Sequence, residues 1–94
     1  AEKQFSLSSA AFMKEDVFLY PNPASNELQI TLKDPQQKIS SIKIMSESGM
    51  IVREMSGLQL EVVTVDTDVL AAGMYLVTVI TFSGQTTKKV VVRH

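Results

Sequence analysis

The sequence contains no cysteine, no tryptophan and a single histidine, His94. Without cysteine the chain can form neither a disulfide framework nor a thiolate metal site, so apolar packing must stabilise it. With two tyrosines and no tryptophan, it offers no stacking platform for bases or sugars. A Ser-His-Asp triad would need His94 to be buried and oriented by a carboxylate, for which a terminal position is poorly suited. We therefore expect a protein with no catalytic residues.

An excess of charge of either sign is also missing. Nine basic and ten acidic residues give a formal net charge of −1. Adjacent basic residues occur only at Lys88 and Lys89, so the basic stripe of a nucleic-acid-binding protein is absent. No run approaches the roughly 18 apolar residues of a transmembrane helix. Residues 1–12 lack the basic and apolar regions of a signal peptide, and we expect any such peptide to lie upstream of them.

The acidic residues offer one candidate metal site. Asp66 and Asp68 are two positions apart, so in an extended chain both side chains would point the same way. Together with Thr67 they resemble a fragment of a calcium loop, but the other acidic residues, the turn glycine and the bidentate glutamate of that loop are missing. We favour capping and turn formation here, with a weak Ca²⁺ site as the open alternative, and we expect no cofactor.

What the sequence does contain is alternation of apolar and polar residues. Leu28, Ile30 and Leu32 alternate with polar residues, which in a strand places three aliphatic side chains on one face. Turn-forming residues recur about every eight to twelve positions, as is typical of a sandwich or barrel. The fold class predicted is all-β: an immunoglobulin-like antiparallel β-sandwich of about seven strands, with a small barrel as the alternative. We predict strands at residues 17–20, 27–33, 39–46, 50–55, 60–66, 74–82 and 86–93.

The predicted strands define an expected core and an expected domain. The two faces of the strand at 74–82 are almost equally apolar, which favours a central strand covered on both sides or an outer face used for contact. Residues 17–94 are expected to form one domain, and residues 1–16 a linker or an edge strand built on Phe5 and Leu7. The expected core contains Leu28, Ile30, Leu32, Ile42, Ile44, Val52, Val65, Leu70, Tyr75, Val77, Val79, Val90 and Val92.

Four segments, in order, resemble the C-terminal sorting domain of the type IX secretion system (Por secretion system). Residues 17–28 hold an aromatic-Pro-Asn-Pro motif followed by small and polar residues and a hydrophobic strand. Residues 42–52 match the mid-domain hairpin of the family. Residues 66–77 fit its D-x-x-x-L-x-x-G-x-Y-x-V pattern, although Asp68 replaces a residue that is often small and polar. Residues 88–92 resemble its closing lysine-rich, β-branched strand.

The resemblance implies a role that residue chemistry alone does not indicate. Such a domain is the secretion signal of a cargo protein that has reached the periplasm. The outer-membrane translocon recognises it, a shuttle protein receives it, and a sortase-like enzyme removes it and anchors the cargo at the cell surface. Cleavage would fall just before the domain, within or beside residues 1–16. The alternative is a non-catalytic binding or spacer module of an extracellular enzyme.

The motif residues also have physical roles in folding. Pro21 and Pro23 fix φ and remove two amide donors, which turns the chain sharply around Asn22. Gly73 is expected to adopt a φ that a Cβ would resist. Tyr75 is expected to bury its ring and to place its hydroxyl near backbone groups.

The closing strand supplies the candidates for translocon recognition, because a β-branched strand is suited to addition onto the sheet edge of a partner. We expect Val90 and Val92, which share a face of this strand with Lys88, to face the core. Lys89 and Val91, on the other face, are expected to face the partner. Exposed edge strands would also permit a weak homodimer. The recognition candidates are Lys88, Lys89, Val90, Val91 and Val92.

Overall fold

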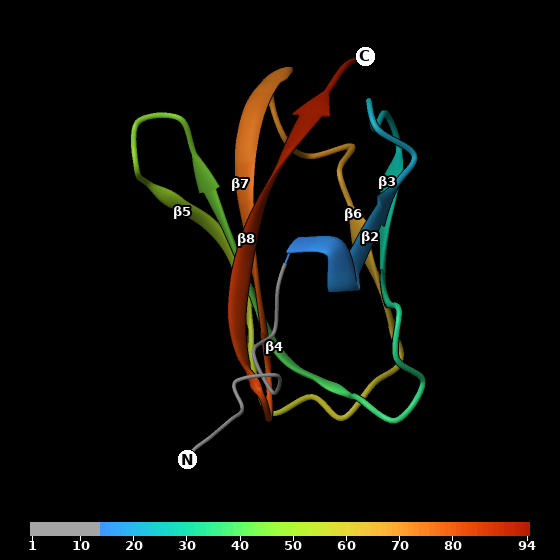
Figure 1. Cartoon of the computed structure of the whole chain (residues 1–94). Helices are drawn as coiled ribbons and strands as arrows, with labels where there is room; N and C mark the ends of the chain where they lie inside the picture. The colour runs from blue at the N-terminus through green and yellow to red at the C-terminus, as the bar shows by residue number, and fades with distance from the viewer. Residues whose placement is uncertain (1–13) are drawn as a thin grey trace.

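The computed structural model describes residues 14–94 and shows two antiparallel sheets packed face to face (Figure 1). A single 3-10 turn, η1 (Lys14–Asp16), precedes the first strand. The three-stranded sheet has the order β2-β3-β6, with β2 at Val17–Tyr20, β3 at Glu27–Leu32 and β6 at Val62–Asp66. The four-stranded sheet has the order β5-β4-β7-β8, with β4 at Ile39–Ser46, β5 at Ile51–Met55, β7 at Gly73–Thr81 and β8 at Gly84–Val92.

These elements confirm the predicted all-β fold. The described part of the chain contains seven strands and no α-helix. The strands at 17–20 and 39–46 begin and end where predicted. Each of the other five strands begins and ends within two residues of its own predicted limits. The strands lie in two separate sheets, as a sandwich requires and a closed barrel does not allow. The finer immunoglobulin-like topology stays a prediction.

The core lies between the two sheets and follows from the alternation. Ten of the thirteen predicted core residues are buried, and Leu32 and Leu70 pack against them while partly exposed. The buried residues that were predicted are Leu28, Ile30, Ile42, Ile44, Val65, Tyr75, Val77, Val79, Val90 and Val92. Four further core residues, Val17, Ala24, Ile39 and Val63, were not predicted.

The prediction that Val52 lies in the core is wrong, since its side chain is 37% exposed. The register shows why. Ile44 pairs with Arg53 and Met45 pairs with Ile51, so Val52 is the unpaired residue of a β-bulge. The bulge interrupts the alternation on β5, an outer strand of its sheet, and four of the five residues of β5 are exposed.

The hairpin between β4 and β5, which lies within the segment matched to the mid-domain hairpin of the family, turns at Gly49. Gly49 has a φ of +90°, a left-handed conformation that glycine adopts at little cost. Its N–H donates to the Ser46 carbonyl at 2.9 Å, and the Ser46 N–H donates to the Met50 carbonyl at 2.8 Å. These two bonds close the turn.

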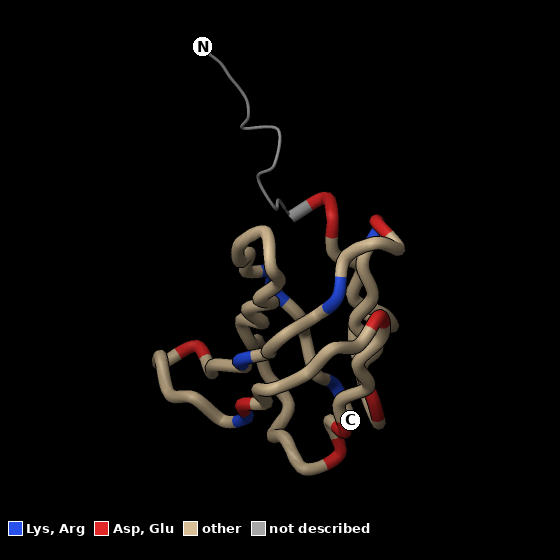
Figure 2. The backbone as a smooth tube through the Cα atoms, turned by 90° about the horizontal axis from the view of Figure 1, so that it is seen from below, with Lys and Arg blue, Asp and Glu red and all other residues tan. Residues whose placement is uncertain are grey.

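Charged residues are distributed over both sheets in the described part of the chain, and no basic stripe forms (Figure 2). A salt bridge joins Lys38, which precedes β4, to Glu61, which precedes β6. No helix within residues 14–94 is long and apolar enough to cross a membrane.

Candidate functional site

The strand β8 carries the five predicted recognition residues and shows the expected alternation. Val90 and Val92 are 2% and 1% exposed, whereas Lys89 is exposed and Val91 is half-buried. On the neighbouring strand β7, Tyr75 lies opposite Val90. The same register continues to the end of β8, where Gly73 lies opposite Val92. The side chains of Lys89 and Val91 therefore lie on the outer face of the sheet, away from the core.

The edge of β8 that faces away from β7 is covered by the segment that follows β2. The Val91 N–H donates to Asn22 Oδ1 at 3.1 Å. The Ala24 N–H donates to the Val91 carbonyl at 2.8 Å, and the Arg93 N–H donates to the Ala24 carbonyl at 2.8 Å. We call Asn22 and Ala24, with these three hydrogen bonds, the edge clamp. The sequence predicted the turn but not this pairing, because it joins segments that are far apart in the chain.

Lys88 connects β8 to the opposite sheet. Its Nζ donates to the Val17 carbonyl at 2.9 Å, and the side chain is half-buried. Val17 begins β2, an outer strand of the three-stranded sheet, and its side chain is fully buried. The two lysines of β8 therefore differ: Lys88 joins the sheets, while Lys89 faces outward.

Thr67, directly after β6 of the three-stranded sheet, supports the segment that carries the edge clamp. It is 1% exposed, although its side chain is polar. Its Oγ1 donates to the Ser25 carbonyl at 3.1 Å, and its N–H donates to the Asn26 carbonyl at 2.9 Å. The position of Thr67 between two aspartates was the only sequence signal for this residue, and it indicated a turn rather than an anchor.

Tyr75 and Gly73 act at the start of β7 as expected. The Tyr75 ring is 7% exposed, and its hydroxyl donates to the Ala71 carbonyl at 2.6 Å. Sandwiches of the immunoglobulin type contain a comparable tyrosine whose hydroxyl bonds back to the backbone a few residues upstream. Gly73 has a φ of +156° and pairs with Val92.

The motif residues thus converge on the last residues of β8. Ala24 forms a parallel bridge with Val92, and Gly73 pairs with the same residue from the other side. Pro21 and Pro23 flank the clamping Asn22, and both X–Pro peptide bonds are cis. Figure 1 shows the connection after β2 beside the C-terminal end of β8. Three motifs that are distant in sequence build one end of the molecule.

One known protein family matches the chain that has this arrangement. Residues 18–93 match the family model of the secretion system C-terminal sorting domain. The chain belongs to this family. Membership confirms the resemblance to type IX sorting domains, and it places the chain among sorting signals rather than catalysts. The search of curated proteins found no match.

One solved structure with a similar fold is superoxide reductase (neelaredoxin) from Ignicoccus hospitalis. The alignment covers 95% of this chain and 100% of that chain, with a TM-score of 0.52 and 10% sequence identity. At this identity the likeness shows a shared fold alone.

The two aspartates of the candidate calcium site take part in a turn of the sorting domain. Asp66 Oδ1 accepts a hydrogen bond from the Asp68 N–H at 3.0 Å, and the Leu70 N–H donates to the Thr67 carbonyl at 3.1 Å. The capping and turn formation favoured for these aspartates are therefore present, with Asp66 as the cap of the turn. Within residues 14–94, no three His, Cys, Asp or Glu side chains are grouped so that they could hold a metal ion.

His94 is exposed, and its Nε2 lies 2.7 Å from the Leu70 carbonyl oxygen. The imidazole therefore contacts the connection between β6 and β7. This contact uses a ring nitrogen that a triad would need for the nucleophile or for the orienting carboxylate.

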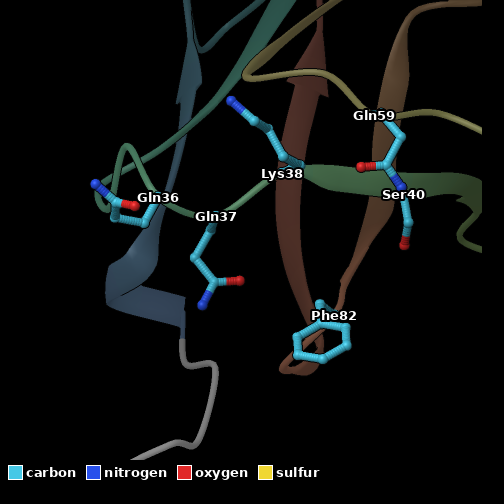
Figure 3. Close-up of a pocket in the computed structure, with 6 residues that line it drawn as sticks. All are labelled: Gln36, Gln37, Lys38, Ser40, Gln59 and Phe82. Atoms are coloured by element: carbon cyan, nitrogen blue, oxygen red, sulfur yellow. The ribbon is translucent and has the colours of Figure 1, made fainter.

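A hollow of about 390 Å³ lies at the opposite end of the sorting domain, beside the turn between β7 and β8 (Figure 3). Gln37 Nε2 donates to Ser83 Oγ at 2.7 Å, while the buried Gln37 Oε1 has no partner among the described residues. Phe82 stands fully exposed at the rim. The lining offers no pair of groups for acid-base catalysis: it consists of Gln36, Gln37, Lys38, Ser40, Gln59 and Phe82.

Proposed function

We propose that this sorting domain directs a cargo protein from the periplasm through the outer-membrane type IX translocon to the cell surface, for anchoring or release. Membership of the sorting-domain family supports the general role in secretion. In the proposed sequence of events, the translocon recognises the folded domain, a shuttle protein receives it, and a sortase-like enzyme cleaves the chain before residue 17. The domain is the ligand and the substrate in these steps, and the chemistry belongs to its partners.

The observation that supports this proposal is the convergence of the family motifs on β8. Lys88, Val90 and Val92 are committed to contacts inside the sandwich. Lys89 and Val91 are the two recognition candidates whose side chains remain on the outer face. We therefore assign recognition to Lys89 and Val91, and we assign support of that surface to the other three residues.

A fusion experiment tests the sorting function. Residues 1–94 are placed after a periplasmic reporter that carries its own signal peptide, in a bacterium with a type IX system. We expect the reporter at the cell surface, and we expect it to stay in the periplasm when the translocon is deleted. Retention of the reporter in both strains would instead favour a binding or spacer module.

A paired substitution tests the assigned surface. Lys89→Glu with Val91→Thr reverses the charge and makes the apolar contact polar while keeping a β-branched side chain. We expect a melting temperature close to that of the parent and at least about tenfold less surface reporter, a loss that corresponds to about 1.4 kcal/mol of recognition. Gln85→Glu is the matched control, because Gln85 is an exposed residue near the far end of the same strand. Normal delivery of the folded double variant would place the signal elsewhere.

Cleavage is tested on the same fusion. We expect the N-terminal residue of the released domain to lie within residues 1–17, as mass spectrometry of the surface and secreted fractions would show. A strain that lacks the sortase-like enzyme should retain the full-length fusion. A released fragment that begins inside β2 or later would contradict the proposed domain boundary.

A further inference from the structure

The edge clamp changes how a partner can bind β8. An outer strand usually presents free N–H and carbonyl groups, to which a partner adds a strand. At the end of β8 the groups of Val91, and of Arg93 directly after the strand, that face away from β7 are already bonded to Asn22 and Ala24. A partner strand could pair at this part of the edge only after the clamp had opened.

The clamp is built to hold one edge and not to extend the sheet. Asn22 contributes its side-chain oxygen as the acceptor for the Val91 N–H. Pro21 and Pro23, on either side of it, have no N–H groups with which a further strand could pair. Ala24 is fully buried, and Thr67 binds the two residues that follow it. The segment is therefore fixed on its far side as well as on the β8 side.

The outer face beside the clamp combines apolar surface with the positive charge of Lys89. Met74 lies opposite Val91, and Leu76 lies opposite Lys89. Met74 is 37% exposed, Leu76 and Val91 are half-buried, and the Lys89 side chain is exposed. Such a face suits a partner that offers an apolar contact flanked by a carboxylate.

We propose that Asn22 is a positioning residue of the sorting signal: the edge clamp stays closed during recognition and presents Lys89 and Val91 by their side chains. The partner is a secretion-system protein that docks an apolar, acid-flanked surface on the outer face of β7 and β8. It does not add a strand at Val91 and Arg93. This inference rests on the proposed sorting function.

Asn22→Ala tests the positioning role. Removal of the acceptor should make the Val91 amide exchange with solvent about two- to tenfold faster, the range expected for one hydrogen bond. Surface delivery of the folded fusion should fall. Asn22→Asp keeps an oxygen acceptor and should restore both the protection and the delivery. Asn26→Ala, in the same segment and with an exposed side chain, should change neither.

Two results of this series would overturn the proposal. One is full delivery by a folded Asn22→Ala variant in which Val91 exchanges faster. The other is an equal loss of delivery in Asn26→Ala, which would show a general need for the segment. The parent fusion separates the two levels of inference: if the parent is not delivered, the sorting function fails, whereas delivery of both parent and Asn22→Ala removes only the role of Asn22.

A crosslink tests closure without removing the hydrogen bond. Ala24 and Val92 are bridge partners, and adjacent strands lie about 4.8 Å apart, within the range that a disulfide spans. Because the chain has no cysteine, Ala24→Cys with Val92→Cys creates a single defined pair. We expect the oxidised fusion to reach the surface as efficiently as the two single-cysteine fusions. Retention of the oxidised fusion alone would show that the clamp must open, and would refute the proposal.

Discussion

The two outer strands of the four-stranded sheet, β5 and β8, have opposite relations to the rest of the molecule. β8 pairs with β7 along its length, is held at its other edge by Asn22 and Ala24, and reaches the opposite sheet through Lys88. β5 pairs with β4 through a bulge, and four of its five residues are exposed. Both strands lie at an edge of the same sheet, yet β8 is bonded to other parts of the domain on both sides, whereas β5, within residues 14–94, is bonded on one side and is mostly exposed.

The difference shows that apolar composition does not decide which edge is buried. Ile51 and Val52 are 47% and 37% exposed, whereas Val90 and Val92 are almost completely covered. What separates them is contact with a segment from the other sheet. A strand with such contacts contributes to stability through its side chains, and a strand without them is the better candidate for contact between molecules, including the predicted weak homodimer.

Identical substitutions on the two strands should give the largest contrast. Val90→Ala leaves a cavity beneath β8 and should lower the free energy of unfolding by about 1–3 kcal/mol. Val52→Ala should change it by less than about 0.5 kcal/mol, because the side chain is already partly in water. Urea unfolding followed by circular dichroism measures both values. Equal losses would mean that β5 is packed as firmly as β8.

The same contrast explains what the sequence could predict. Alternation located β8 and the inward positions of Val90 and Val92, because a period of two is a local property of a strand. It failed at Val52, where a bulge changes the register. It could not find Ala24 as a core residue, since the burial of this small side chain depends on a bridge to Val92.

The candidate site was predictable to a similar extent. The motif residues could be named from the order of four segments, and the tyrosine hydroxyl was expected to meet the backbone. The bonds from Asn22 to Val91 and from Lys88 to Val17 could not be predicted. Each joins residues about 70 positions apart, and no local pattern specifies such a partner.

The two adjacent lysines of β8 allow a second, smaller contrast. Lys88→Met keeps a long side chain but removes the ammonium that binds the Val17 carbonyl, and it should cost about 1–2 kcal/mol. Lys89→Met removes an outward charge and should cost less than about 0.5 kcal/mol. Thermal unfolding of both variants at the same pH measures the difference. A larger loss in Lys89→Met would contradict the assigned orientations.

The smallest effect is expected at the Lys38–Glu61 pair, which joins the connection before β4 to the connection that leaves β5. The Lys38 ammonium, hydrogen-bonded to Glu61 Oε2 at 2.6 Å, lowers the pKa of that carboxyl below its ordinary value of 4.5. A lowered pKa in the folded state adds stability above the unfolded pKa, and this is lost as the pH falls through the folded pKa. The contribution is small because both side chains are largely exposed.

Titration of the Glu61 carboxyl carbon by NMR measures this effect directly. We expect a midpoint below 4.5 in the parent and a return toward 4.5 in Lys38→Gln. Lys43→Gln, on β4, is the control and should leave the midpoint unchanged. A midpoint in the parent at or above the ordinary value would show that the ion pair does not persist in solution.

The long span of the edge clamp has a consequence for the time at which the recognition surface forms. Asn22 and Val91 are 69 positions apart, so almost the whole domain must be arranged before their bond can close. Contacts between residues so distant must overcome the entropy of closing a long loop, and folds that depend on such non-local contacts form more slowly than folds built on local ones. A partner that requires the clamped geometry would therefore accept only domains that have finished folding, and an extended copy of the same strand would not be mistaken for one.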